Sequence, residues 1–359
     1  MPSIDQPLIQ IVPWLRPGRC GISDHAVALA KELQAGFGVG TNFVALKESG
    51  PGNLPFPVLH STPEKLLQTC DSLIDRQRGA ILVHLSGYGY SPDGVPARLA
   101  TALAQVKASG RFRVAVYFHE LFAVGPPWKS AFWHSRRQQT AVRAIAELCD
   151  MALTNTRYHA DWLERQMGKR SSDLLKLLPV FSTIGEVSQP APLAERKPAM
   201  AVFGLPGTRQ SAYRQLAALG DTLKDIGISH FFDIGPAFDT PSYVGGVSVQ
   251  RMGELSAAEL AGVLSSCMFG FVHHPPFCLA KSSIFAGYCA QGVIPVIAEN
   301  FRGDVDGLTD GLHVVSPMTS ATAKAAGWEA CSRAAWNWYM THRVQLHAKE
   351  YAEWIGTPA

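Results

Sequence analysis

His119 and Glu120 stand at a place in the sequence where chemistry is common. They directly follow the apolar run Arg113–Phe118, which has the composition of a buried strand. An imidazole next to a carboxylate can orient a hydroxyl group or move a proton near neutral pH. A structural histidine is the commoner use of a lone His, but the position after a core strand favours a functional role. We therefore predict that His119 and Glu120 are catalytic.

A second segment, Lys281-Ser282-Ser283, precedes a helical pattern and combines a cation with two hydroxyl groups. Together with the free amides of a helix N-terminus, these groups would bind a diphosphate. The glycine-bearing turn Gly204–Arg209 follows another predicted strand, and Arg209 would supply a second cation. Each cation alone would be read as a solvated surface charge. Their shared position at strand ends predicts a diphosphate site.

The segment Arg16–Asp24 follows the first predicted strand and contains glycines. Glycines let the backbone approach a ligand closely at a helix N-terminus. Gly21 is therefore assigned to the diphosphate, and Asp24 to the acceptor side of the catalytic site. An ordinary turn with Ser23 or Asp24 as the helix N-cap is the plainer alternative, and this segment alone favours it.

The segment Ser86–Pro96 interleaves Tyr88 and Tyr90 with glycines. Tyrosines on such a loop can stack on the apolar face of a sugar ring and hydrogen-bond its hydroxyls. A loop whose tyrosines simply fill a groove is an equally good interpretation. Trp128, downstream of His119, is assigned with the two tyrosines to the sugar or the acceptor.

Three other patterns do not indicate a ligand site. Gly36–Gly40 lies between a predicted helix and the next strand, the reverse of the dinucleotide-binding order, so NAD binding is not supported. Asp304-Val305-Asp306 resembles a metal-binding pair, but no third ligand is suggested nearby and we interpret it as a turn. His273-His274 has no acidic neighbour and is interpreted as structural. We expect neither a metal ion nor a cofactor.

Short apolar runs alternate with helical patterns along the whole chain, which is typical of parallel sheets built from βαβ units. In the first half, strands are predicted at Leu8–Val12, Thr41–Leu46, Ala80–Leu85, Arg113–Phe118, Met151–Thr154 and Leu177–Phe181. In the second half they are predicted at Met200–Phe203, His230–Ile234, Gly246–Gln250, Met268–His273 and Val293–Ala298. The clearest helix start is the capping box Ser256–Glu259. The fold class is therefore α/β.

A length of 359 residues favours two domains. Residues 185–198 lack apolar periodicity and contain three prolines, so the interdomain linker is predicted there. We expect an N-terminal domain over 1–184 and a C-terminal domain over 185–339. A helix over 340–359 is expected to pack back onto the first domain.

Composition excludes several classes of protein. The 32 basic and 29 acidic residues are scattered without a basic run, so nucleic acid is not an expected partner. The seven cysteines contain no Cys-x-x-Cys pair, and reduced thiols in the cytoplasm are the simplest interpretation. No signal-peptide pattern and no apolar stretch of about 18 residues is present, which argues against export and membrane spanning. Peripheral membrane association stays open.

In their order along the chain, these segments resemble the family 4-like GT-B glycosyltransferases. Within that family, they are similar to the bacterial exopolysaccharide and heterocyst envelope polysaccharide enzymes. The resemblance rests on GISDHAVALAKEL, GYGYSPDGVP, FHELFAVGPPWKSAFW, LCDMALTNTRYHADWL and LSAAELAGVLSSCMFGFVHHPPFCLAKSSIFAGYCAQGVIPV. It covers most of the chain, and the order of the segments is more specific than any one of them.

The resemblance implies two Rossmann-like domains that face each other across a cleft, an acceptor-side domain over 1–184 and a nucleotide-sugar-binding domain over 185–339. It also implies transfer of a hexose from a UDP-sugar such as UDP-glucose to a saccharide or lipid-linked acceptor, with retention and without a metal ion, in polysaccharide biosynthesis. His119 matches the family's active-site histidine, and Arg209 and Lys281 match its diphosphate-binding cations. Arg251-Met252-Gly253 corresponds to the segment that reads the nucleotide base.

One departure from the family pattern weakens this assignment. The family commonly has two glutamates, eight positions apart, that serve the sugar and the ribose, whereas the aligned positions here are Leu279 and Gly287. A nucleotide-sugar-binding protein with weak or no transferase activity is therefore the first alternative. A nucleotide-sugar epimerase on the same fold ranks third.

Overall fold

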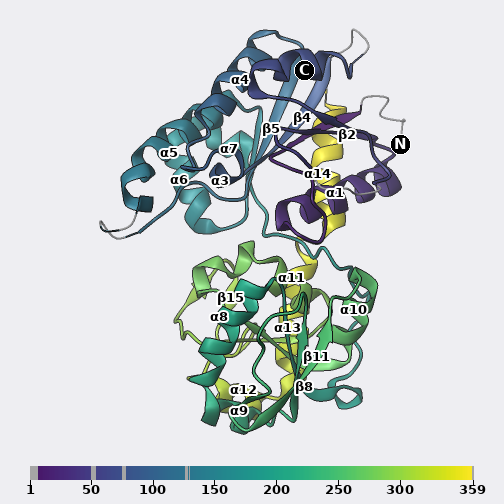
Figure 1. The fold of residues 1–359 in the computed structure, drawn as a ribbon, viewed down its shortest axis with the longest axis vertical. Helices are drawn as coiled ribbons and strands as arrows, with labels where there is room; N and C mark the ends of the chain where they lie inside the picture. The colour runs from purple at the N-terminus through teal and green to yellow at the C-terminus, as the bar shows by residue number, and fades with distance from the viewer. Residues whose placement is uncertain (1–6, 50–53, 75–77, 126–127, 129, 358–359) are drawn as a thin grey trace. The chain divides into compact units, whose positions relative to one another are not determined.

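The computed structural model describes residues 7–49, 54–74, 78–125, 128 and 130–357. Contacts within the chain divide it into two compact units (Figure 1). Unit 1 comprises Met1–Pro179 with Val344–Ala359, and unit 2 comprises Val180–Arg343. Each unit is an α/β domain built around its own sheet.

The sheet of unit 1 has seven strands in the order β3-β2-β1-β4-β5-β6-β7. Each pair of adjacent strands is parallel. Its central strands are continuous apolar runs because both faces are covered by helices. The bounds are β1 Leu8–Val12, β2 Thr41–Ala45, β3 Val58–His60, β4 Gly79–Leu85, β5 Phe112–Phe118, β6 Met151–Thr154 and β7 Leu175–Leu177.

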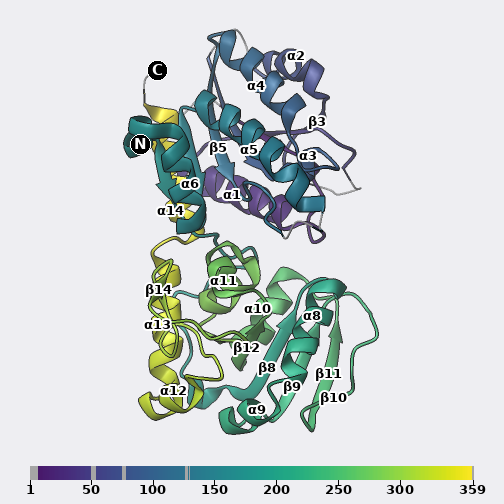
Figure 2. The ribbon, with the colours of Figure 1, turned by 90° about the vertical axis from the view of Figure 1, so that its left-hand side faces the viewer.

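The helices of unit 1 form two layers. Helix α1 packs against α14, which returns from the end of the chain, and Figures 1 and 2 show this pair on the opposite face of the sheet from α4 and α5. The bounds are α1 Gly21–Phe37, η1 Pro63–Lys65, α2 Leu66–Asp71, α3 Gly87–Tyr90, α4 Ala97–Ala108, α5 Ser130–Leu148, α6 Arg157–Met167, η2 Gly168–Arg170, α7 Ser171–Leu174 and α14 Val344–Gly356.

The main sheet of unit 2 has six strands in the order β10-β11-β9-β8-β12-β13, of which only the short β10 is antiparallel to its neighbour. A separate hairpin pairs β14 with β15. The bounds are β8 Lys197–Phe203, β9 His230–Ile234, β10 Tyr243–Val244, β11 Val247–Gly253, β12 Cys267–Val272, β13 Ile294–Ile297, β14 Asp304–Val305 and β15 Leu308–Thr309.

The strands of unit 2 lie between α8 and α10 in Figure 1. The capping box predicted at the start of α10 is confirmed: Ser256 Oγ accepts from the Glu259 N–H at 3.3 Å, and Glu259 Oε2 accepts from the Ser256 N–H at 2.8 Å. The bounds are η3 Leu193–Glu195, α8 Pro206–Ala217, α9 Gly220–Ile226, α10 Ala257–Ser265, η4 Pro276–Lys281, α11 Ser283–Ala290, α12 Ser320–Ala326 and α13 Trp328–Met340.

Some local predictions differ from the structure. A strand is predicted at Leu177–Phe181, but β7 spans Leu175–Leu177 and shares only Leu177 with the prediction. The stretch 185–198, interpreted as a linker from its prolines, lies within unit 2. Its Arg196 is buried and donates to the backbone oxygens of Ala191, Cys267 and Gly292. A guanidinium bonded to three carbonyls thus fixes the short connection between η3 and β8.

Both sheets have the strand order of a Rossmann domain. In each, the chain starts in the middle, builds one half and then crosses over to build the other. The reversal falls between β1 and β4 in unit 1 and between β8 and β12 in unit 2. Ligands of doubly wound sheets bind beyond the carboxyl ends of the strands at this reversal. The loops after these four strands and after β5 therefore define where a site is expected.

Candidate functional site

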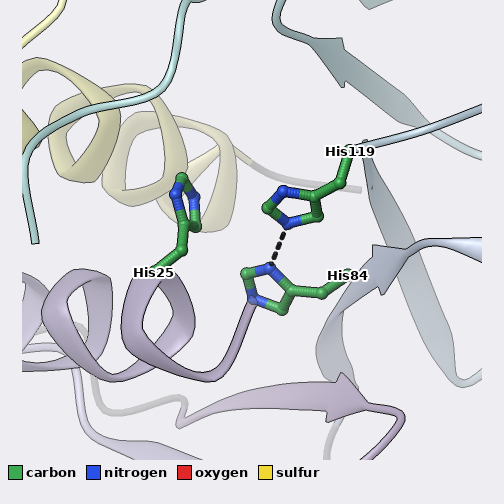
Figure 3. A group of neighbouring side chains, drawn as sticks. All are labelled: His25, His84 and His119. Carbon is green, nitrogen blue, oxygen red and sulfur yellow. Dashed lines mark hydrogen bonds between the residues drawn. The ribbon is translucent and has the colours of Figure 1, made fainter. Parts of the chain in front are cut away.

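Three histidines converge beneath the carboxyl edge of the unit 1 sheet (Figure 3). They come from separate elements: His25 from α1, His84 from β4, and His119 from the residue after β5. His84 Nδ1 lies 3.1 Å from His119 Nε2. The His25 ring meets the His119 ring edge-on, with centroids 4.9 Å apart. His119, predicted from its position after a strand, thus lies in a cluster of imidazoles.

Burial lowers the pKa of every histidine in this cluster. The pKa of His84 falls to about 3, and those of His25 and His119 also lie well below the usual 6.5. His347 of α14, whose Nε2 lies 3.0 Å from Pro179 O, has its pKa lowered to about 4 by burial. All four imidazoles are therefore neutral at pH 7.

The same three side chains are within reach of one metal ion. One ring nitrogen of each of His25, His84 and His119 lies within 4.8 Å of the others. Neutral imidazoles are good ligands for transition metals. They carry no negative charge, however, so a divalent cation would bring its full charge into a buried place.

Glu120 turns outward where His119 turns inward. Its side chain is exposed, and its Oε2 accepts a hydrogen bond from Ser86 Oγ at 3.1 Å. The backbone of His119 is fixed on both sides, because its N–H donates to Leu85 O and its carbonyl accepts from Asn155 Nδ2. The carboxylate at the surface and the imidazole below it thus come from a single well-held turn.

Ser23 and Asp24 do not cap α1 as expected. The N-cap is Cys20, without a side-chain hydrogen bond. Asp24 Oδ1 instead accepts from the Gly18 N–H at 2.6 Å, and Ser23 Oγ accepts from the Arg16 N–H at 3.0 Å. Both side chains therefore hold the preceding loop in place. Burial raises the pKa of Asp24, and the Gly18 hydrogen bond opposes that shift.

Gly21 is exposed at the first position of α1. The neighbouring tyrosine segment contains a single helical turn, α3, instead of an irregular loop. Tyr88 is 46% exposed and Trp128 is 83% exposed, as contact with a sugar or acceptor requires. The adjacent Pro126 and Pro127 lie outside the described residues.

Tyr90 corrects a prediction. Its hydroxyl points inward and donates to His84 O at 3.0 Å, and Ile11 O lies 3.3 Å away. Burial raises its pKa well above the usual value. The ring thus braces the ends of β1 and β4, and its hydroxyl is already engaged where a sugar contact was expected.

In unit 2, the reversal point brings together the N-terminus of α8 and the loop after β12. Gly204 adopts a φ of 131°, and Pro206 occupies the first turn of α8, where the lack of an N–H costs nothing. Gly207 is exposed, and no atom lies within 4 Å of where a Cβ would be. The first amides of α8 are therefore accessible to an anion. Lys281 is half-buried at the end of η4.

Arg209 is predicted to bind the diphosphate, but its guanidinium is engaged inside unit 2. Its side chain is 1% exposed and pairs with Asp233 at 2.5 Å. Its Nε donates to Gly204 O at 3.0 Å, and its remaining terminal nitrogen donates to Pro236 O. The guanidinium thus ties the loops after β8 and β9 together from inside. A diphosphate could not reach it without breaking the ion pair, so its role here is structural.

Ser282 is also engaged inside the protein. Its Oγ accepts from the Phe285 N–H at 3.2 Å as the N-cap of α11, and it lies 3.0 Å from His274 Nδ1. Burial lowers the pKa of His274 to about 4. The structural interpretation of His274 therefore holds, whereas the Ser282 hydroxyl does not point to a ligand. Ser283, at the first position of α11, is half-buried.

The predicted base-reading segment ends β11. Arg251 is exposed, and its guanidinium donates to Thr240 O. Gly253 has a φ of 74°, which only glycine adopts without strain, and its carbonyl accepts from the Gly235 N–H at 2.8 Å. Together with the half-buried Met252, this segment lies at the carboxyl edge of the sheet.

The two positions that lack the family glutamates are packing positions. Leu279 is fully buried. A Cβ added at Gly287 would lie 3.2 Å from Ile184 Cδ1 and 3.5 Å from Phe203 Cζ. A carboxylate at either place would be desolvated among apolar atoms. In contrast, Asp304 of the pattern dismissed as a metal site accepts from the Gly307 N–H within the β14–β15 hairpin turn.

Gln10, His25, His84 and His347 were not predicted as site residues. The signal for Gln10 and His84 was present, because a polar side chain inside an apolar strand must find a buried partner. His347 could not have been found from the sequence, since its neighbours in space lie more than 160 positions away.

The whole chain is similar to solved structures of nucleotide-sugar enzymes. One is Anabaena Alr3699/HepE in complex with UDP and glucose, with a TM-score of 0.63, 10% identity, and 98% of this chain and 100% of that chain covered. A second is an alpha-glucosyltransferase in complex with UDP and a 13-mer DNA, with a TM-score of 0.61, 12% identity, and 98% and 99% covered. A third is a putative UDP-N-acetylglucosamine 2-epimerase from Listeria monocytogenes, with a TM-score of 0.58, 9% identity, and 96% and 95% covered.

These similarities define the architecture as GT-B, with two Rossmann-like domains. No protein-family model and no curated protein matches the sequence. Among the described residues, no helix is both long and apolar enough to cross a membrane. Because one of the similar structures holds DNA, the exclusion of nucleic acid from composition is not supported.

Proposed function

We propose that the protein is a glycosyltransferase that transfers a hexose from a UDP-sugar, such as UDP-glucose, to a saccharide or lipid-linked acceptor. The observation that carries this proposal is the reversal point of unit 2, where the accessible N-terminus of α8 and Lys281 occur on a GT-B architecture. The end-to-end similarity to structures that hold UDP supports the same donor class.

In this proposal, unit 2 holds the donor. The diphosphate binds the first amides of α8 and Lys281, with Ser283 and the amides of α11 beside it. Negative charge grows on the leaving diphosphate as the glycosidic bond breaks, so these donors stabilise the transition state more than the ground state. Arg209 contributes indirectly, by holding Gly204 at the start of this loop. Backbone groups of Arg251–Gly253 would contact the base.

Unit 1 supplies the groups that act on the sugar and the acceptor. His119 and Glu120 orient hydroxyls, Asp24 and Gly21 lie at the start of α1, and Tyr88 and Trp128 offer exposed rings for stacking. We propose retention of configuration without a glycosyl-enzyme intermediate and without a required metal ion. A glycosylated Glu120 trapped and identified by mass spectrometry would show that the reaction does pass through a glycosyl-enzyme intermediate.

We place the reaction in polysaccharide or glycoconjugate biosynthesis in the cytoplasm, with peripheral association at a membrane when the acceptor is lipid-linked. A nucleic-acid acceptor is compatible with the fold, so DNA belongs among the acceptors tested.

The experiment is the Lys281→Ala variant, assayed for UDP release from UDP-glucose with and without acceptors. Loss of one transition-state donor costs about 3 kcal/mol, so kcat should fall about 100- to 1000-fold. The control is Lys324→Ala, which removes an exposed lysine of α12 and should leave kcat unchanged. Unaltered turnover by Lys281→Ala would remove this residue from the mechanism.

A specific observation favours a second candidate, a protein that binds a nucleotide sugar without transferring it. Leu279 and Gly287 pack against apolar neighbours, so no carboxylate is available at the places where the family holds the sugar and ribose. Calorimetry that detects UDP-glucose binding, together with no UDP release for any acceptor, would favour this candidate over the transferase.

A further inference from the structure

A continuous hydrogen-bonded chain connects the interior of the unit 1 sheet to His119. Gln10 Oε1 lies 2.7 Å from His84 Nε2, and His84 Nδ1 lies 3.1 Å from His119 Nε2. Gln10 and His84 are fully buried in adjacent parallel strands. His119, at the end of the chain, is the most exposed of the three residues at 9%, whereas Gln10 and His84 are at 0%.

The chain has a defined direction. An amide oxygen only accepts hydrogen bonds, so the proton of His84 is on Nε2. Because burial keeps His84 neutral, its Nδ1 carries a lone pair and must accept. His119 Nε2 therefore donates to His84, and the proton of the neutral His119 ring is placed on Nε2. Its Nδ1 is left as a hydrogen-bond acceptor.

We propose that Gln10 and His84 are positioning residues that hold His119 as its Nε2–H tautomer, so that Nδ1 accepts a hydrogen bond from a hydroxyl of the sugar or the acceptor. The contact with a substrate hydroxyl rests on the proposed transferase function. The tautomer of His119 does not depend on that function. The other tautomer would turn a donor toward the hydroxyl and set two lone pairs against each other at 3.1 Å.

A metal ion is the competing explanation for the clustered rings. Two nitrogens bound to the same tetrahedral zinc lie about 3.3 Å apart, close to the spacing of His84 and His119. The third nitrogen, from His25, lies within a wider 4.8 Å limit, and no ligand is charged. The hydrogen-bonded chain also explains why Gln10 lies against His84. A zinc site formed by the three histidines does not require Gln10.

The direct test is the imidazole nitrogen spectrum of the ligand-free protein labelled with ¹⁵N-histidine, with His119 assigned by comparison with His119→Gln. We expect a protonated Nε2 and an unprotonated Nδ1 for His119 at pH 7. Gln10→Met removes the acceptor and should give a mixture of tautomers. Gln10→Glu in its ionised form offers only acceptor oxygens to His84 Nε2 and should restore the wild-type pattern. A His119 protonated at Nδ1 in the wild type would overturn the proposal, even if the variants fail to fold.

The second readout is turnover. Gln10→Met should lower kcat for transfer about 10-fold with little change in the KM of the UDP-sugar, and Gln10→Glu should recover most of it. Wild-type kcat in a Gln10→Met protein with mixed tautomers would contradict the functional half of the proposal. If no transfer is seen for any variant, the proposed function fails while the tautomer result stands.

Zinc titration followed by calorimetry separates the rival explanation. If the hydrogen-bonded chain is the correct explanation, the wild-type protein should bind no stoichiometric zinc. One equivalent of zinc bound tightly, and lost in His25→Ala, would show that His119 Nε2 is a ligand and would overturn this explanation.

Discussion

Each sheet ends in a buried polar network, and the two networks differ in charge. In unit 1, Gln10, His84 and His119 form a neutral chain beneath the strand ends. In unit 2, Arg209 and Asp233 form an ion pair that is 1% and 4% exposed. Asp233 also accepts from Thr240 Oγ1 and from the hydroxyl of Tyr213.

The difference explains which network can reach a ligand. A buried charge must be paired and hydrogen-bonded. The guanidinium of Arg209 therefore donates to Asp233, Gly204 and Pro236. A neutral ring has no such requirement, and His119 can leave one nitrogen for a substrate. The ionic network therefore shapes the loops of its unit, whereas the neutral one can take part in chemistry.

The largest expected effect comes from breaking the ion pair. Arg209→Met leaves Asp233 buried without its partner and should lower the free energy of unfolding of unit 2 by about 3 to 5 kcal/mol. The control is Arg214→Met, on an exposed position of the same helix, which should change it by less than about 0.5 kcal/mol. Urea unfolding measures both. A well-folded Arg209→Met protein that has lost only UDP affinity would mean that Arg209 is a ligand after all.

Acid should weaken unit 1 through its neutral histidines. The folded pKa values of His84 and His347, about 3 and about 4, lie below the unfolded value of 6.5. The unfolded chain therefore binds protons first, so stability is full above pH 6.5 and falls as the pH drops toward the folded values. The cost per histidine rises from about 0.7 kcal/mol per pH unit at pH 6.5 to about 1.4 kcal/mol per pH unit near pH 5.

Hydrogen exchange followed by mass spectrometry can measure that loss in each unit separately. Between pH 6.5 and 5.5 we expect unit 1 to lose about 2 kcal/mol from these two residues, because the unfolded imidazoles are only half protonated at the start of this window. Unit 2 should lose about half as much, through His274, whose folded pKa is about 4. In His84→Phe the pH-dependent loss of unit 1 should shrink by about 1 kcal/mol. If unit 1 of His84→Phe loses as much stability over this pH range as the wild type, His84 is not held neutral by burial.

The smallest effect concerns neither network. Ser256→Ala removes the side-chain acceptor of the α10 capping box and should cost about 1 kcal/mol, whereas Ser256→Gly should cost only a few tenths. Thermal melting of both variants measures the difference. A loss as large as that of Arg209→Met would mean that removing this cap is as costly as leaving the buried Asp233 without its partner.

The sequence predicts the framework well because parallel strands buried on both faces are continuous apolar runs. Leu8–Val12, Met151–Thr154 and His230–Ile234 form strands with the predicted bounds. The short edge strand Val58–His60 was missed, because three residues of mixed burial carry no such signal.

The site is less predictable because residue type does not reveal the partner. Arg209 looked like a ligand-binding cation, but Asp233 is 24 positions away and folds against it. Tyr90 looked like a sugar-binding ring, yet its hydroxyl bonds to the strand ends beneath it. His119 and Glu120 were found because their position after β5 places them at the sheet edge whatever their partners are.

The most direct measurement is a crystal structure of the protein with UDP-glucose. We predict that the diphosphate oxygens lie within hydrogen-bonding distance of the Gly207 amide and of Lys281 Nζ, while Arg209 stays paired with Asp233. A diphosphate bound away from the N-terminus of α8, or an Arg209 that has left Asp233 to contact phosphate, would contradict the account.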